Sequence, residues 1–338
     1  MSEQEVAGTT SQGNGEPGRR RLWVALFIRL FREKPLGVVG LVLVAVLFFC
    51  GIFANFLAPE GYTTMHLDKR LSPPSREYPL GNDELGRNVL SRIIWGARLS
   101  MIVGITATAI HTVISTAIGM LSAYLGGKFD LIVQRLVDAW ICFPGLVILI
   151  TLMALVGPGL LQIILVLGVS SGISAIRFKR SLVFSIKENI YIHASEAIGA
   201  RTGRILWSHV LPNIMPMIIV LFTIGMGGVI LAEASLSFLG LGLPDPYPSW
   251  GRMISGPGRT YMLQAPWMGM WPGVALTLAV FGINMLGDAM RDLLDPRLRG
   301  GVGGYSIDRA ERARLKVQKK LESSREEFDR DIESVRKP

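Results

Sequence analysis

The chain has 338 residues, of which 50% are hydrophobic and only 18% are charged. A soluble domain normally carries about a quarter charged residues, so this composition indicates a membrane protein and argues against a soluble single-core enzyme. The net charge of +9 comes from Lys and Arg beside apolar segments, as expected for cations kept on the cytoplasmic side of a membrane. No basic patch with interleaved aromatic residues suggests nucleic acid as a partner.

The first 35 residues divide into two segments of different character. Residues 1–18 are rich in Gly, Ser, Thr and Glu and lack an apolar run, which predicts a disordered leader and not a signal peptide. Residues 19–35 mix Leu, Trp and Phe with Arg and Lys, which is typical of an amphipathic helix lying in the membrane surface.

Six apolar runs follow, each of about the length needed to cross a bilayer. They cover residues 36–57, 99–124, 136–156, 160–176, 214–232 and 268–286. The sequence therefore predicts an all-α membrane protein with six transmembrane helices. Residues 36–299 would form the membrane domain, with an outer segment at 58–96 and a long loop at 177–213 on the other side.

The distribution of charge predicts the orientation of these helices. The 177–213 loop carries six cations against two acids, whereas the charges of the 58–96 segment are balanced. Both termini are therefore expected in the cytoplasm. Residues 300–338 begin with a glycine hinge and are highly charged, so we expect a solvated cytoplasmic tail.

The 177–213 loop is longer than the roughly two to eight residues that usually join packed helices. Its composition predicts a short helix at 189–198, ended by Gly199 in the left-handed conformation, and a second helix at 202–210 before Leu211 and Pro212. This arrangement fits either a docking element or a pair of helices resting on the bilayer.

The sequence lacks the motifs expected for ATP hydrolysis and for metal binding. No phosphate-binding loop of the G-x-x-x-x-G-K-[ST] type occurs, so we expect no ATP hydrolysis by this chain alone. The four histidines are scattered, Cys50 and Cys142 lie in apolar runs, and no metal site is expected. His111 lies within a predicted span and Glu233 near the end of another, which makes them possible pathway residues.

The 177–213 loop resembles the cytoplasmic signature of permeases of bacterial binding-protein-dependent ABC importers. That signature reads Glu-Ala-Ala, three residues, Gly, nine residues, Ile, one residue, Leu-Pro. Four positions match here, namely Ala194, Gly199, Leu211 and Pro212, and three differ, since His193, Ser195 and His209 replace Glu, Ala and Ile. With their neighbours Tyr191, Glu196 and Ala200, these residues are the candidate coupling site.

Further stretches are similar to the second permease of dipeptide and oligopeptide systems. Residues 80–100 supply an outer-face motif that contains Asp83, Gly86, Arg87, Ser91, Arg92 and Arg98. Residues 232–251 and the DPRLR of 295–299 match as well, so the resemblance covers about residues 20–299.

The resemblance implies a type I ABC importer permease that does no covalent chemistry and forms half of a translocation pathway for short peptides. It implies a homologous permease, ABC ATPase subunits that hold ATP and Mg, and an extracytoplasmic solute-binding protein as partners, with no cofactor in this chain. Similar permeases carry nickel chelates or oligosaccharides. The alternative from another class is an ion-coupled carrier or a channel, which has no need of a long docking loop.

Overall fold

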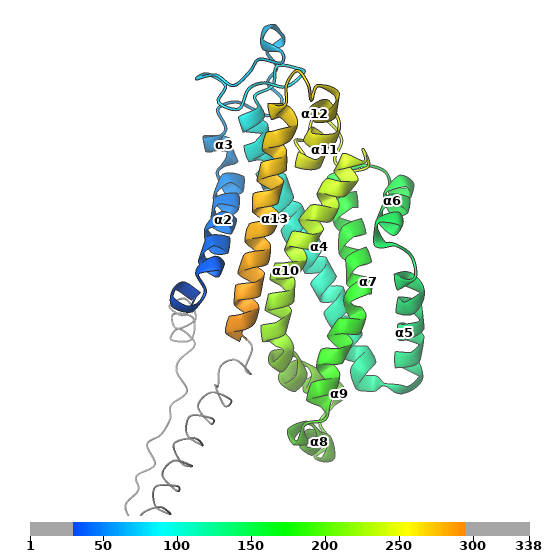
Figure 1. Cartoon of the computed structure of the whole chain (residues 1–338). Coiled ribbons are helices and arrows are strands. Elements are labelled where there is room, and N and C mark those ends of the chain that lie inside the picture. Colours follow the sequence, from blue (N-terminus) through cyan, green and yellow to red (C-terminus); the bar gives the residue numbers. More distant parts are fainter. Residues whose placement is uncertain (1–29, 295–338) are drawn as a thin grey trace, which may run out of the picture. The chain divides into compact units, whose positions relative to one another are not determined.

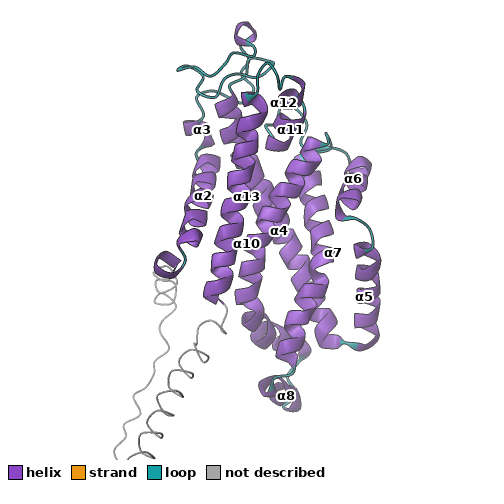
Figure 2. Cartoon of the chain, viewed as in Figure 1, coloured by secondary structure: helices purple, strands orange, loops and turns teal. Residues whose placement is uncertain are grey.

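The computed structural model describes residues 30–294, and all of its regular elements are helical (Figures 1 and 2). The expected leader, most of the surface helix at 19–35, and the tail at 300–338 lie outside the described residues. The helices are α2 Pro35–Ile52, α3 Ala54–Leu57, η1 Leu67–Lys69, α4 Val89–Leu125, α5 Gly127–Ile141, α6 Gly145–Val156, α7 Leu160–Lys187, α8 Ile190–Ala197, α9 Thr202–Ile205, η2 Leu206–Val210, α10 Leu211–Phe238, α11 Trp250–Ser255, α12 Pro257–Thr260 and α13 Trp267–Leu294.

Five helical segments are individually long and apolar enough to cross a membrane. They are α2, α4, α7, the run from α9 through α10, and α13. Helices α5 and α6 meet at an angle of 89° and do not form one straight helix. Counted together as one bent span, they are the sixth. The predicted count of six therefore holds, although the span expected at 136–156 is broken at Pro144, and the run at 160–176 belongs to a helix of 28 residues.

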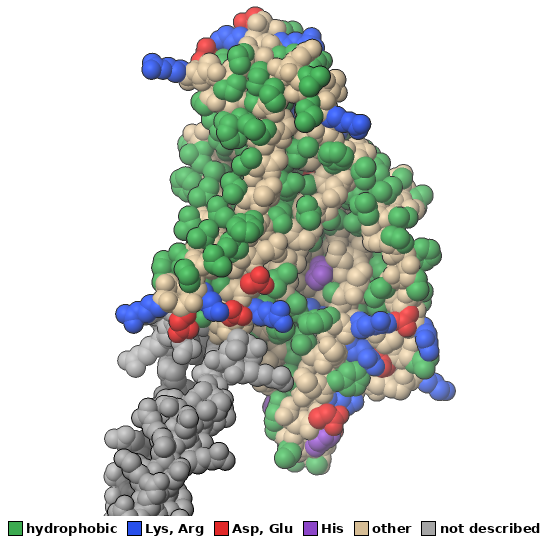
Figure 3. Space-filling model, in the orientation of Figure 1, with side chains coloured by type: hydrophobic (Ala, Val, Ile, Leu, Met, Phe, Trp, Pro, Cys, Tyr) green, Lys and Arg blue, Asp and Glu red, His purple; other side chains and the backbone are tan. Residues whose placement is uncertain are grey.

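Helix α4 is central to the bundle and packs closely against α7. Glycines permit this approach, because a Cβ on Gly168 would lie 2.8 Å from the Ile110 side chain and one on Gly172 would lie 3.2 Å from that of Ile114. Small residues at helix crossings are typical of membrane bundles, where close packing provides much of the association energy. Apolar side chains cover the middle of the visible surface, and charged side chains gather towards its two ends (Figure 3).

Two loop boundaries differ from expectation. The first eleven residues of the expected 177–213 loop continue α7 to Lys187, and the outer segment ends at Asn88, where α4 begins. Both differences have the same cause, because the polar ends of a spanning helix extend past the hydrocarbon core and are not apolar. Hydropathy alone therefore makes these two helices too short, at the start of α4 and at the end of α7.

Candidate functional site

Helix α8 projects from the end of the bundle opposite the outer segment (Figure 1). It begins after Asn189 and ends at Ala197, which matches the predicted helix at 189–198 within one residue at each end. Exposed apolar side chains flank it, since Ile190 is 86% and Ile198 is 84% exposed, and Trp207 of η2 is 72% exposed. Exposed large apolar side chains on a projecting element are typical of a protein-binding surface.

One buried side chain and two polar contacts fix α8 to the bundle. Ile192 is fully buried in an apolar cluster with residues of α4, α7, η2 and α10. Tyr124 at the end of α4 donates its hydroxyl to Glu196 Oε1 over 2.8 Å, and Asn213 of α10 donates Nδ2–H to Tyr191 Oη over 3.3 Å. Helix α8 is therefore attached to the ends of two spanning helices.

Gly199 ends α8 in the way the sequence predicts. Its φ is +79°, in the left-handed region, and its N–H donates to Glu196 O while the N–H of Ala200 donates to Ser195 O. This pair of hydrogen bonds is the Schellman motif, which satisfies the last carbonyls of a helix and turns the chain away from its axis. The following helix, α9, therefore starts in a new direction.

The second half of the segment leads directly into a spanning helix. Helix α9, the π-helical turn η2 and α10 are continuous, with Leu211 and Pro212 in the first turn of α10. Proline lacks an N–H and its ring crowds the carbonyl four residues earlier, here that of Ser208. The wider π-helical turn before Pro212 accommodates this ring without ending the helix.

The candidate coupling residues lie on two faces of this segment. His193, Ala194 and Glu196 are exposed, whereas Ser195 and Ala200 are half-buried. His193 Nδ1 lies 3.5 Å from Glu196 Oε2, so the acid that the family signature places at 193 is present one helical turn later. The exposed face is thus a mixed surface of small, polar and apolar side chains.

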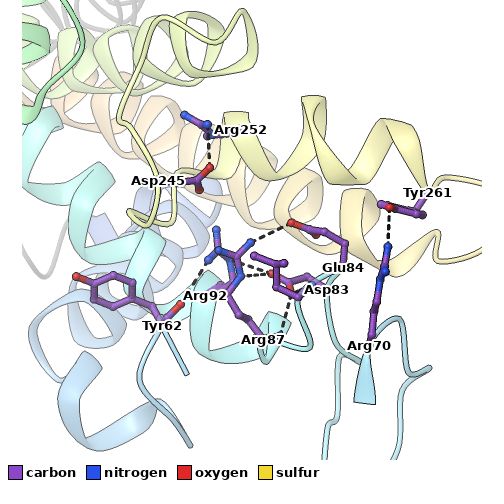
Figure 4. Close-up of polar contacts among 10 residues, drawn as sticks. Tyr62, Arg70, Asp83, Glu84, Arg87, Arg92, Asp245, Arg252 and Tyr261 are labelled. Carbon is purple, nitrogen blue, oxygen red and sulfur yellow. Dashed lines mark hydrogen bonds and ion pairs between the residues drawn. The ribbon is translucent and has the colours of Figure 1, made fainter. Parts of the chain in front are cut away.

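The outer-face motif forms a buried cluster of charges (Figure 4). Asp83 accepts hydrogen bonds from the N–H groups of Leu85 and Arg87 and, over 2.6 Å, from Arg87 Nε–H. Arg92 Nε lies 3.7 Å from Asp83 Oδ2, and its Nη1–H donates to Tyr62 O. Both arginine side chains are about 95% buried, so Asp83 supplies a counter-charge where little water can reach.

Neighbouring residues extend this cluster. Arg87 Nη2–H also donates to Glu84 Oε1, and burial raises the pKa of the Glu84 carboxyl. Gly86 has φ +73°, and a Cβ there would lie 1.9 Å from His66 O. The cavity beside the cluster has a volume of about 40 Å³, which is room for a few water molecules. The hydrogen bonds and ion pairs of the motif hold parts of the outer segment together, and the cavity beside it is too small for a peptide.

Ser91 and Arg98 attach the same motif to α3 and to the start of the outer segment, which follow the first span. The Glu60 N–H donates to Ser91 Oγ, and Arg98 Nη1–H donates to Asn55 Oδ1 over 2.9 Å. Across the outer face, Arg70 donates to the Tyr261 hydroxyl, which joins the 58–88 segment to the segment before α13 (Figure 4). These contacts connect elements that are far apart in the sequence.

The two possible pathway residues are not brought together. Glu233 is 2% exposed and its Oε1 accepts hydrogen bonds from Ser237 over 2.7 Å and Ser249 over 2.9 Å, so it joins α10 to the start of α11. His111 of α4 is half-buried, and its Nδ1 has no hydrogen-bond partner among the described residues. Among those residues no cluster of His, Cys, Asp or Glu fits a metal ion.

Sequence reasoning missed the ion pairs between α5 and α7. Arg180 donates to both carboxylate oxygens of Asp130, and Arg177 pairs with Asp138. Both arginines had been interpreted as loop cations. Lys179 was treated in the same way, yet it is 1% exposed and its Nζ lacks a partner in the described part of the chain. The acidic residues at 130 and 138 give only a weak indication of ion pairs, because the sequence does not identify which residue, 39 to 50 positions later, pairs with each acid.

Comparison with known proteins identifies the family. A family model described as "binding-protein-dependent transport system inner membrane component" matches residues 115–300, and one for the N-terminal transmembrane domain of oligopeptide transport permease C matches residues 22–74. The chain belongs to the family of binding-protein-dependent transport system inner membrane components. This membership confirms the predicted type I ABC permease fold, and the protein is a multi-pass membrane protein.

Curated relatives align over most of their own length. The chain is 37% identical to the dipeptide transport system permease protein DppC of Alkalihalophilus pseudofirmus, over 82% of this chain and 90% of that protein. It is 36% identical to the oligopeptide transport system permease protein OppC of Bacillus subtilis, with the same two coverages. It is 33% identical to the probable D,D-dipeptide transport system permease protein DdpC of Escherichia coli, over 89% of this chain and 98% of that protein.

Proposed function

We propose that this permease forms half of the translocation pathway for short peptides in an ATP-driven importer. The names of its relatives support peptides as the cargo. The observation that carries the ATP-driven part is α8, a short helix with exposed apolar ends that is fixed to α4 and α10. A partner that grips α8 from the cytoplasm can move these two spanning helices directly.

The partners follow from what the chain itself lacks. Without a phosphate-binding loop, ATP and Mg belong to ABC ATPase subunits docked on α8, and this chain is not itself an enzyme. A homologous permease completes the pathway, and a solute-binding protein delivers the peptide at the outer segment. Both termini then lie in the cytoplasm, on the side of α8.

The test is reconstitution of the importer from purified subunits. Proteoliposomes that contain this chain, its co-purifying permease and its ATPases, with the solute-binding protein on the opposite side of the membrane, should accumulate labelled di- and tripeptides only when ATP is present on the ATPase side. The chain alone should neither hydrolyse ATP nor transport. Peptide accumulation by the chain alone under an ion gradient would establish an ion-coupled carrier, and ATP-driven uptake of a nickel chelate or oligosaccharide but no peptide would correct the cargo.

A further inference from the structure

The third span is interrupted part-way along its length. Helix α5 ends at Ile141, α6 begins at Gly145, and their axes differ by 89°. Pro144 explains the interruption, because proline removes an N–H and disfavours a helical Phe143. Figure 1 places this break beside the middle of α7. Since α7 is a spanning helix, the break lies within the membrane region. There, non-helical backbone is tolerated only where protein buries it or where it lines a water-filled cavity.

A cavity of about 300 Å³ lies at this break, against α7. Its volume is at the lower end of the range of about 300–1,000 Å³ that is typical of small-molecule sites. None of the lining side chains is charged: they are Trp140, Ile141, Phe143, Gly145, Ile148, Leu149, Ser170, Ser171 and Ser174. The hydroxyl groups all come from α7, and the aromatic rings come from the break.

The walls offer both hydrogen-bond donors and acceptors. The first N–H groups of α6, at Gly145 and Leu146, have no carbonyl one turn earlier to bind, as at any helix start. Ser174 donates to Ser170 O over 3.2 Å, whereas the Ser171 hydroxyl makes no hydrogen bond within the described residues. A lipid chain offers these groups no hydrogen-bond partner, which favours water or a polar ligand in the cavity.

Two ion pairs hold the walls together just below the cavity. Arg177, one turn after Ser174, pairs with Asp138, and Arg180 pairs with Asp130. Both pairs join α5 to α7, and each places its cation against an acid. Each of these four charges therefore has a counter-charge, and none of the side chains that line the cavity is charged.

We propose that this break cavity is a subsite of the translocation path that binds a neutral stretch of peptide, a main-chain amide together with an uncharged side chain. The inference rests on the proposed transport of peptides. Each amide carries one donor and one acceptor, which serine hydroxyls and free helix-end groups can match. Trp140 and Phe143 supply apolar surface for the side chain, and an ionised side chain would find no partner here.

Filling the cavity provides the first test. In the complete importer, Ser171→Leu should lower trialanine uptake by about tenfold, because it removes a hydroxyl and occupies the space. Ser181→Leu is the matched control, since Ser181 is an exposed serine of α7 outside the cavity, and its uptake should be that of the wild type. Wild-type uptake by Ser171→Leu at equal membrane abundance overturns the proposal.

Thiol labelling tests hydration and peptide binding without depending on transport. With Cys50 and Cys142 replaced by Ser, a thiol introduced by Ser171→Cys should react in opened vesicles with a charged, water-soluble methanethiosulfonate, and trialanine should slow the reaction. Leu155→Cys, at a position of α6 that is 78% exposed, should not react. If the Ser171 position reacts only with a lipid-soluble maleimide, lipid fills the cavity and the proposal is wrong.

The two proposals fail in different ways. An importer whose wild-type form carries no peptide disproves the proposed function, whatever the cavity contains. Normal peptide uptake by Ser171→Leu, or absence of trialanine protection in a wild-type importer that does carry trialanine, disproves only the subsite.

Discussion

At Gly199 the backbone adopts φ +79° in open space, since no atom lies within 4 Å of where a Cβ would be. A side chain there meets no obstacle, so any penalty comes from the backbone conformation, which costs an L-residue about 1–2 kcal/mol. Gly199→Ala should therefore loosen the end of α8 and reduce both ATPase association and peptide uptake, and Gly199→Val should do so more strongly. Pull-down of the ATPases from membranes of equal permease content measures the effect.

Gly203 provides the matched control for this prediction. It also has no atom within 4 Å of a Cβ, but it lies in α9 without a positive φ. Gly203→Ala should leave coupling unchanged, because alanine favours a helix over glycine by up to about 1 kcal/mol. Equal loss in both variants would mean that the segment tolerates no side chain on that surface, and the conformational argument for Gly199 would be wrong.

Asp83 should contribute more to the stability of the protein than an exposed acid of the outer segment does, because its ion pairs are buried. Asp83→Asn removes the carboxylate that Arg87 and Arg92 share and leaves Glu84 as the remaining acid beside Arg87, and breaking a buried ion pair costs about 3–5 kcal/mol. We expect a clearly lower unfolding temperature in detergent. Glu77→Gln is the control, because the Lys69–Glu77 pair is exposed and should leave the unfolding temperature unchanged. Similar unfolding temperatures for both variants would show that Asp83 is dispensable.

At the scale of helices, the crossing of α4 and α7 depends on a glycine at a close contact. A Cβ on Gly168 would lie 2.8 Å from Ile110 and 3.0 Å from Ala107 O, so Gly168→Ala must push the helices apart at a cost of about 1–3 kcal/mol. Gly228→Ala, also inside a spanning helix but with nothing within 4 Å of its Cβ, should be neutral. Thermal stability of the purified variants distinguishes the two, and equal values would contradict the packing argument.

Local signals in the sequence predict where helices form better than they predict which helices contact one another. The helix at 189–198 and the positive φ of Gly199 depend on residues within one turn, so they could be read directly. The break at Pro144 was missed, because a hydropathy window averages over three residues that interrupt an apolar run. The partners of Arg177 and Arg180 could not be predicted, since the packing of α5 against α7 decides them.

For the whole molecule, the described residues fix which segments share an end of the bundle. The outer segment lies at one end and α8 at the other (Figure 1). With both cysteines replaced, a thiol from Ser75→Cys should react with an impermeant reagent added to intact cells. A thiol from Ser185→Cys, near the end of α7 before α8, should react only after the cells are opened. The reverse pattern would invert the proposed orientation.

Helix α4 has 37 residues, which at about 1.5 Å each gives a length of about 55 Å, far more than the roughly 30 Å of a hydrocarbon core. Arg92 in its first turns belongs to the outer charge cluster, and Tyr124 in its last turn holds α8. In the proposed importer, one unbroken helix therefore joins the segment that would receive the solute-binding protein to the helix on which the ATPases would dock. If α4 tilts as a rigid body, a displacement at one end appears at the other, and the proposed importer then senses arrival of cargo and docking of the ATPases through the same helix.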